Sequence, residues 1–171
     1  MSVKPEPVEI RALAEADIEA VGALAREIWR AHYPGIISSA QIEYMLDQRY
    51  SSALMRAELG KQGLWWDLLL RAGAPKAFSS YFRTERSDEM KLDKLYVHPD
   101  CQRRGYGALL IDRALARARS EHCSRLVLAV NRGNANAIAA YRKHGFQIES
   151  AVVKEIGGGY VMDDYVMVRS L

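Results

Sequence analysis

The amino-acid sequence predicts an α/β fold, in which helices flank a mixed and mostly antiparallel β-sheet. Segments with the alternating apolar pattern of strands are interspersed with segments of helical periodicity, in the order βααβββαβαββ. Short turns rich in glycine or proline join two pairs of these strands, which is typical of hairpins. With 171 residues, of which 49% are hydrophobic and 26% charged, the chain is expected to form a single globular domain.

The strands are predicted where apolar residues lie between turn residues, at 8–13, 64–70, 76–83, 92–97, 125–130, 146–156 and 160–168. The turn at 72–75 and the three consecutive glycines at 157–159 close the two hairpins. Pro99 ends the strand at 92–97, because proline lacks a backbone N–H and restricts the residue before it.

The helices are predicted where apolar residues recur three and four positions apart, from Asp17 toward Trp29 or His32, from Ser38 through Leu46, from Gly107 through Ala118 and from Asn134 through Tyr141. Ser38 and Gln41 have the spacing of a capping box, and either Asn134 or Asn136 can cap the last helix. Residues 50–60 allow two readings, a further helical turn followed by a loop or a separate short helix.

A glycine-rich turn at residues 102–107, with the sequence Gln-Arg-Arg-Gly-Tyr-Gly, lies between the strand at 92–97 and the following helix. Its glycines allow backbone N–H groups to approach a ligand that side chains would otherwise block. The first turn of a helix has unpaired N–H donors and a partial positive charge, so it attracts anions. Arg103 and Arg104 add positive charge beside it. The turn is therefore predicted to bind a pyrophosphate group.

Two common phosphate-binding motifs do not fit this turn. A P-loop requires Lys and then Ser or Thr after the glycine, whereas Gly107 is followed by Ala108. A dinucleotide-binding fingerprint requires a third glycine, and position 110 is Leu.

The spacing Gln-x-x-Gly-x-Gly after a strand resembles the acyl-CoA motif of the GNAT superfamily of N-acyltransferases. A second match lies downstream, where Asn134, Ala137, Tyr141, Gly145 and Phe146 follow that family's helix-to-strand pattern. The resemblance implies the same mixed sheet and one N-acetyltransferase domain over residues 1–171. The acyl-CoA core of that domain would lie at about residues 90–147.

The resemblance also implies acetyl-CoA as co-substrate, without a metal, bound by Leu95, Tyr96, Val97, Gln102, Arg103, Arg104, Gly105, Tyr106, Gly107, Ala108, Asn134 and Tyr141. Tyr141 would in addition protonate the departing CoA thiolate, which a phenol can do at short range. The alternatives are a core aromatic packed on Phe146 for Tyr141 and a simple helix cap for Asn134. The two cysteines lie in no metal-ligand spacing.

The general base is the least defined part of the predicted site. An amine is protonated at neutral pH, so a group must accept its proton before it can attack. Asp93 shares strand parity with Leu95 and Val97 and is one candidate, and Glu89, at the mouth of the same strand, is another. The alternative for each is a solvated surface carboxylate. Asp163 and Asp164 could attract a cationic amine or form the charged rim of a hairpin.

The sequence thus predicts an N-acetyltransferase that transfers an acetyl group to a primary amine of a small molecule or peptide, by direct attack in a ternary complex. Residues 34–46 and 90–92 loosely resemble the polyamine-acetyltransferase branch. The alternative is a non-catalytic acyl-CoA-binding sensor with the same fold. Acyl-CoA binding without acetylation of any amine would distinguish such a sensor from the enzyme.

Charge and hydropathy predict no nucleic-acid or membrane partner. A net charge of +3 comes without the concentrated basic stripe that nucleic-acid binding requires. No apolar stretch is long enough to span a membrane, and the N-terminus has no apolar run of a signal peptide. We therefore expect a cytoplasmic location, with Cys101 and Cys123 unpaired. A homodimer is expected from the general prevalence of such assemblies.

Overall fold

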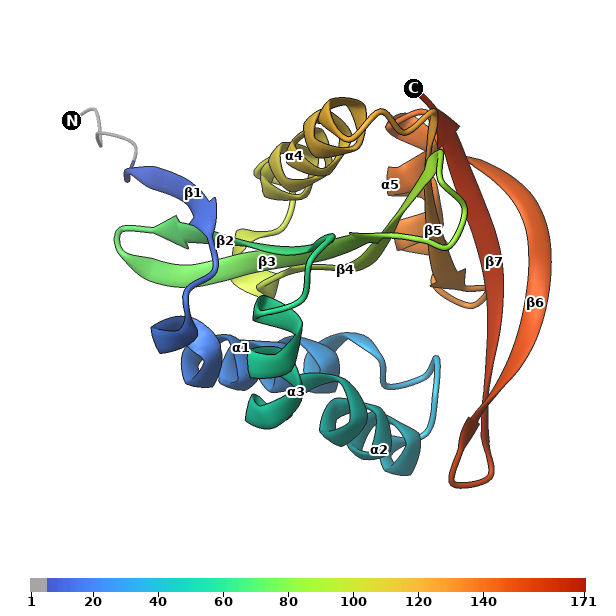
Figure 1. Ribbon diagram of the computed structural model, residues 1–171. Coiled ribbons are helices and arrows are strands. Elements are labelled where there is room, and N and C mark those ends of the chain that lie inside the picture. The colour runs from blue at the N-terminus through green and yellow to red at the C-terminus, as the bar shows by residue number, and fades with distance from the viewer. Residues whose placement is uncertain (1–5) are drawn as a thin grey trace.

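The computed structural model describes residues 6–171, which form one seven-stranded sheet with the strand order β1-β2-β3-β4-β5-β7-β6 (Figure 1). The strands are β1 (Val8–Ala12), β2 (Leu64–Arg71), β3 (Ala74–Arg83), β4 (Glu89–Val97), β5 (Arg125–Asn131), β6 (Gln147–Gly157) and β7 (Tyr160–Ser170). Neighbouring strands are antiparallel except β4 and β5, which are parallel. The predicted fold class is therefore confirmed.

The helices lie on both faces of this sheet; they are α1 (Ile18–His32), α2 (Ser39–Tyr50), α3 (Ser52–Leu59), α4 (Tyr106–Ser120) and α5 (Ala135–Lys143). Figure 1 shows the first three helices on one face and α4 on the other. Short 3₁₀ helices at Glu15–Asp17 and Pro99–Cys101 precede α1 and follow β4.

The element order contains one helix more than the sequence predicted. Of the two readings left open for residues 50–60, the structure has the separate helix, α3. The helical conformation is interrupted between α2 and α3 at Ser51, whose backbone is extended with ψ 143°. The Ser51 hydroxyl accepts a hydrogen bond from the N–H of Leu54. A serine N-cap thus starts a new helix where the sequence alone did not distinguish a continuation from a restart.

Each face of the sheet carries its own apolar core. Under α1–α3 the fully buried side chains include Trp29, Leu46, Met55, Leu68 and Phe78. Under α4 and α5 they include Met90, Leu115, Leu126, Phe146 and Met167. Burial of these large apolar side chains fixes the sheet between two layers of helices, so the strand ends are held in place.

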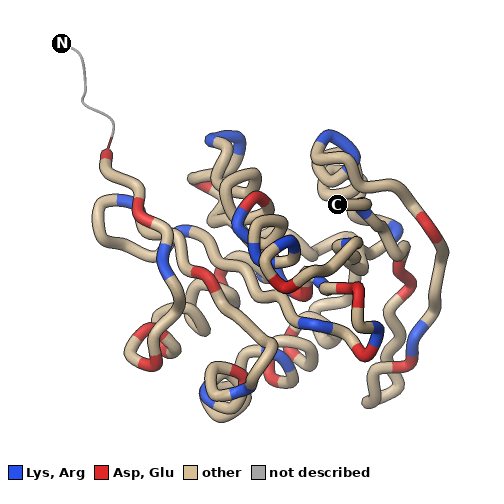
Figure 2. Tube along the Cα trace, turned by 45° about the horizontal axis from the view of Figure 1, so that its top comes forward, with Lys and Arg blue, Asp and Glu red and all other residues tan. Residues whose placement is uncertain are grey.

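The charged residues are distributed over many elements, and Figure 2 shows Lys and Arg interspersed with Asp and Glu along the trace. In the described part of the chain, no helix combines the length and the apolar character needed to cross a bilayer.

Candidate active site

Strands β4 and β5 are paired over only part of their length. The register between them ends where Leu92 pairs with Leu128, although β4 continues to Val97 and β5 to Asn131. Beyond the last pair the two strands diverge. Between residues 6 and 171 no strand pairs with residues 93–97 on this side, so the backbone N–H and C=O groups of residues 94–97 that point away from β3 are available to a ligand.

A β-bulge at Asp93 marks the point where β4 leaves β5. In the antiparallel pair of β3 and β4, Ser80 pairs with Lys94, whereas the next residue of β3 pairs with Leu92. Asp93 therefore has no partner of its own. A bulge bends its strand and increases the local twist, which accounts for the divergence. Arg49 of α2 holds the bulge, since its Nη2 donates to the Asp93 carbonyl oxygen at 3.2 Å.

The glycine-rich turn leads from this strand into α4. Gly105 has φ +80° and Arg103 has φ +60°, both in the left-handed region that glycine adopts without strain. The first hydrogen bond of α4 joins Leu109 N to Gly105 O at 3.1 Å, so the preceding N–H groups have no intrahelical acceptor. A Cβ on Gly105 would meet no atom within 4 Å. The space in front of the turn is open to an anion.

A cavity of about 900 Å³ extends from this turn, along the gap between β4 and β5, to α2 and the β6–β7 hairpin. Its wall brings together most of the residues that the sequence predicted: Asp93, Leu95, Tyr96, Val97, Gln102, Arg103, Gly105, Gly107, Ala108, Asn134 and Tyr141. The two sequence motifs, which are separated along the chain, therefore face the same space.

Arg104 and Tyr106, which were also predicted to bind acetyl-CoA, are not part of this wall. Tyr106 is 8% exposed and packs with Cys101 and Leu110 in the core beneath α4. Arg104 is exposed to solvent. Any direct contact of these two residues with a ligand would come from their backbone N–H groups within the turn.

Helix α5 contributes the second motif to the cavity. Asn134 rather than Asn136 is its N-cap, and Asn134 Oδ1 accepts from the N–H of Ala137 at 3.4 Å. The half-buried Tyr141 ring packs edge-on against Phe146, with 5.7 Å between ring centroids, and also lines the cavity. Burial, and to a smaller extent Tyr33, raises the pKa of Tyr141, so its phenol keeps its proton at neutral pH.

The carboxylate of Asp93 lies between two cations. Its Oδ2 is 2.6 Å from Lys94 Nζ and 3.4 Å from Arg49 Nη2. Burial raises the pKa of Asp93, but the charges of Arg49 and Lys94 outweigh this effect and lower it to about 2. A carboxylate with such a pKa is a weak proton acceptor, so this geometry favours a role in holding the bulge.

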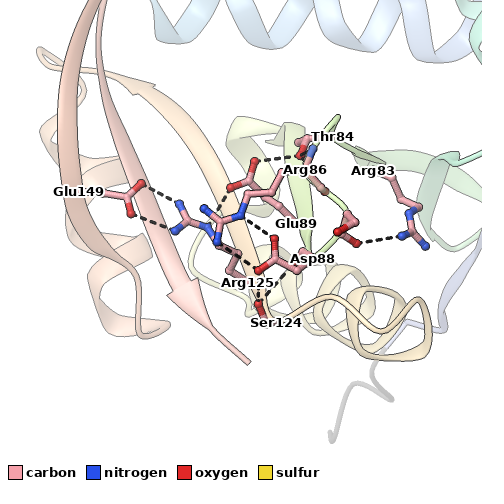
Figure 3. Close-up of polar contacts among 9 residues, drawn as sticks. Arg83, Thr84, Arg86, Asp88, Glu89, Ser124, Arg125 and Glu149 are labelled. Carbon is pink, nitrogen blue, oxygen red and sulfur yellow. Dashed lines mark hydrogen bonds and ion pairs between the residues drawn. The ribbon is translucent and has the colours of Figure 1, made fainter.

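Glu89, the other acidic candidate on β4, takes part in a polar network at the start of the strand (Figure 3). Its Oε2 lies 2.9 Å from Arg125 Nε, and its Oε1 accepts from the Thr84 hydroxyl at 2.9 Å. This network joins β4 and β5 at the end where they are still paired. Glu89 is not part of the cavity wall.

Helix α2 and the β6–β7 hairpin meet at the far end of the cavity. The Tyr44 hydroxyl donates to the Ile156 carbonyl at 3.0 Å, and Gln41 Nε2 donates to the Val161 carbonyl at 2.8 Å. Gly157, with φ +89°, permits this approach because a Cβ there would lie 2.5 Å from Tyr44 Oη. These contacts connect two segments that are more than a hundred residues apart.

Five charged residues of the cavity wall were not among the predicted site residues, namely Arg49, Lys91, Lys143, Lys154 and Asp164. The sequence left Asp164 and its neighbour Asp163 undistinguished. In the structure Asp164 lines the cavity, whereas Asp163 pairs with Arg132 at 3.6 Å and is half exposed. Alternation along a strand places adjacent residues on opposite faces, but the sequence does not tell which face of β7 lines the cavity.

This arrangement suits an extended ligand with a phosphate end and a reactive end. A single cavity is lined by an anion-binding turn, an open strand edge, a protonated phenol and two carboxylates. Over residues 6–171, no group of three or more His, Cys, Asp or Glu side chains is arranged to hold a metal ion.

Known proteins show the same organisation. The model of the acetyltransferase (GNAT) family matches residues 23–146. A spermidine N(1)-acetyltransferase of Thermoplasma acidophilum is 28% identical over 144 residues, which are 83% of this chain and 89% of that protein. A probable N-acetyltransferase of Mycobacterium tuberculosis is 29% identical over 153 residues, which are 86% of this chain and 84% of that protein.

Solved structures agree with this in fold. PaiA N-acetyltransferase of Thermoplasma acidophilum, in complex with coenzyme A, has a TM-score of 0.83 at 22% identity and covers 96% of this chain and 99% of its own. A GCN5-related N-acetyltransferase of Rhodopseudomonas palustris has a TM-score of 0.81 at 22% identity, with both chains covered in full. Since the family match spans most of the chain and includes both motifs that face the cavity, this chain belongs to the acetyltransferase (GNAT) family and is an acetyl-CoA-dependent N-acetyltransferase.

Proposed function

We propose that this chain binds acetyl-CoA between β4 and β5 and transfers its acetyl group to a primary amine of a small molecule or peptide. The observation that carries the proposal is the opening of the β4–β5 pair after Leu92, directly in front of the α4 N-terminus. A ligand that has a pyrophosphate and a long polar arm fits the turn and the open strand edge together.

The residues present fit the predicted binding roles. The N–H groups of residues 105–108, with the Arg103 guanidinium, would hold the pyrophosphate. The free backbone edge at 95–97 would pair with the amides of the pantetheine arm, as another strand would. Asn134 lines the cavity from α5 and would contact the same arm. When bound, acetyl-CoA supplies an activated thioester carbonyl.

The chain's own groups would then position the reactants and handle charge. A backbone N–H of the β4 edge near the carbonyl would stabilise the oxyanion that develops during attack. Holding amine and thioester in one cavity removes much of the entropic cost of bringing them together. Tyr141, which keeps its proton at neutral pH, would protonate the departing sulfur. A phenol placed in this cavity favours catalysis over the alternative of acyl-CoA sensing alone.

The predicted role of Asp93 as a general base stays a prediction, and its surroundings favour another role. Its ion pairs with Lys94 and Arg49 keep it ionised, so it would orient the β4 edge instead of receiving a proton. The acceptor would enter beside α2 and the β6–β7 hairpin. Because one relative is named a spermidine N(1)-acetyltransferase, polyamines are the first amines to test.

A homodimer and a cytoplasmic location complete the proposal. β6 is an edge strand of the sheet and exposes Val152 and Val153, which are 43% and 64% exposed. Such an edge offers unpaired backbone groups to a second copy. Sedimentation of the wild type and of Val153→Lys would test this, since a charge at the edge should shift the protein to monomer. Both cysteines are free and buried, as expected in a reducing compartment.

The decisive experiment is a melting-temperature series with acetyl-CoA, CoA and NADH. A ligand that binds only the folded state raises apparent stability by mass action. We expect a shift with both CoA species and none with NADH, and loss of the shift in Gly105→Trp. Gly73→Trp is the matched control, because Gly73 has φ +79° and equally open space but lies in the β2–β3 turn, away from the cavity. The proposal would be overturned if saturating CoA stabilised neither the wild type nor the control.

A further inference from the structure

Two carboxylates line the cavity within the described residues, those of Asp93 and Asp164. They differ in their partners. Asp93 has Lys94 and Arg49 within 4.0 Å. No Lys, Arg or His nitrogen of residues 6–171 lies that close to Asp164, and no hydrogen bond to its side chain is formed. Asp164 is therefore the acidic group of this wall that remains free for a cationic ligand.

The position of Asp164 is fixed by the sheet. It lies on β7, where it pairs with Asn131 of β5 and with Val152 of β6. Met162 and Val166, two residues before and after it, also line the cavity, as alternation along a strand requires. Asp164 thus faces the cavity beyond the point at which β5 has separated from β4.

The two oxygens of this carboxylate are in different surroundings. Oδ1 is buried and has no hydrogen-bond donor, which makes the ionised form costly. The residue as a whole is half-buried and lines the cavity, so Oδ2 is the oxygen that a ligand can reach.

The balance of nearby groups makes Asp164 a better proton acceptor than Asp93. Burial raises the pKa of Asp164 and outweighs the charges around it. The charged groups that act on it are Lys91 of β4, Arg49 of α2, Asp163 of its own strand and Lys154 of β6. The Asp164 charge in turn adds to the effect of burial in raising the pKa of Tyr33, the residue that follows α1.

We propose that Asp164 binds the ammonium group of the acceptor and accepts its first proton. This inference rests on the proposed function and assigns the general base of that reaction. The neutral nitrogen then bonds to the acetyl carbonyl carbon, and the carbon–sulfur bond breaks with its electron pair on sulfur. Sulfur takes the Tyr141 proton, and the second proton leaving nitrogen returns through solvent to the phenolate. Asp164 releases its proton when the product leaves.

The test compares Asp164→Asn with Asp163→Asn, which removes the same charge from the adjacent residue that pairs with Arg132 outside the cavity. The acceptor is whichever amine the wild type acetylates fastest among spermidine, N-α-acetyl-lysine and a short peptide with a free N-terminus. We expect kcat/KM for this amine to fall about 10²- to 10³-fold in Asp164→Asn and to stay within about twofold in Asp163→Asn. Asp164→Glu should recover part of the activity.

Two further readouts separate a base from a structural residue. The acidic limb of the kcat/KM profile against pH should be the same in the wild type and Asp163→Asn. In Asp164→Asn it should be replaced by a rise at higher pH that follows the ionisation of the amine itself. The melting-temperature shift with acetyl-CoA should be the same in all three proteins, which would show that the fold and the glycine-rich turn are intact. Equal amine kinetics, or an unchanged acidic limb, in Asp164→Asn would overturn the inference alone. No shift with acetyl-CoA and no acetylation by the wild type would overturn the proposed function together with it.

Discussion

Asp93 and Lys94 are consecutive residues of β4, yet their side chains form an ion pair with 2.6 Å between Oδ2 and Nζ. Consecutive side chains of a regular strand point to opposite faces, so this contact requires the bulge at Asp93. The Lys94 side chain is only 3% exposed and lies over the Trp66 ring, with Glu58 at 3.6 Å. The bulge that opens the active-site cavity therefore also buries a lysine whose nearest counter-charge is Asp93.

Asp93→Asn is expected to destabilise the protein by about 3 kcal/mol, because it leaves the buried Lys94 ammonium and the partly exposed Arg49 guanidinium without their closest anion. Urea unfolding followed by tryptophan fluorescence would measure the change. The double variant with Lys94→Met should recover part of the loss, since the uncompensated ammonium is then removed. A loss below about 0.5 kcal/mol in the single variant would mean that Glu58 and solvent neutralise the lysine unaided.

The stability of the protein at acid pH should also depend on this ion pair, because protonation of Asp93 removes it. The pKa of Asp93 is lowered to about 2 in the folded protein from an ordinary value near 3.8. Its contribution to stability is therefore complete above the unfolded pKa and is lost as the pH falls from about 4 toward 2. Relative to Asp93→Asn, the wild type should lose about 2 kcal/mol more across this interval. Parallel stability curves for the two proteins from pH 5 to 2 would contradict this.

The sequence predicts those parts of the site that are formed by contiguous residues, and not those that depend on pairing between distant strands. The turn at 102–107 is formed by contiguous residues, so its position before α4 was predictable from composition and spacing, whereas the choice between Asn134 and Asn136 as helix cap was not. The Asp93 bulge depends on the β3–β4 register, which no single segment of sequence contains. The side of β7 on which Asp164 lies depends on pairing with β5 and β6, the latter with two register shifts. Tertiary pairing thus decided which acidic residues faced the cavity.

The contact between Tyr44 and the β6–β7 turn should control the acceptor end of the cavity. Gly157→Ala places a Cβ 2.5 Å from Tyr44 Oη, so the hydroxyl must leave its 3.0 Å hydrogen bond to Ile156. We expect KM for the amine to rise several-fold while the affinity for acetyl-CoA is unchanged. Gly159→Ala is the matched control, since Gly159 has φ +79° but no atom within 4 Å of its Cβ. Equal effects of the two variants would assign the change to backbone strain alone.

Removal of the Tyr141 hydroxyl tests the proton donor. Tyr141→Phe preserves the ring contact with Phe146, so stability should change by less than about 1 kcal/mol. If the phenol protonates the leaving sulfur, kcat should fall about 10²-fold, with little change in the dissociation constant of acetyl-CoA. Steady-state kinetics combined with calorimetric titration would separate the two quantities. An unchanged kcat would leave Tyr141 with its packing role only.

The two adjacent arginines of the glycine-rich turn provide the sharpest test of pyrophosphate binding there. Arg103 lines the cavity and Arg104 does not, although both variants to Gln change the net charge by the same amount. A charge-assisted contact to the pyrophosphate contributes about 1.5–3 kcal/mol, so Arg103→Gln should raise the dissociation constant of CoA tenfold or more. Arg104→Gln should change it by less than threefold, and this small change should disappear at high salt because it reflects long-range attraction only. If both variants weakened binding equally at high salt, the arginines would act together on the phosphates, and the cavity-facing position of Arg103 would confer no advantage.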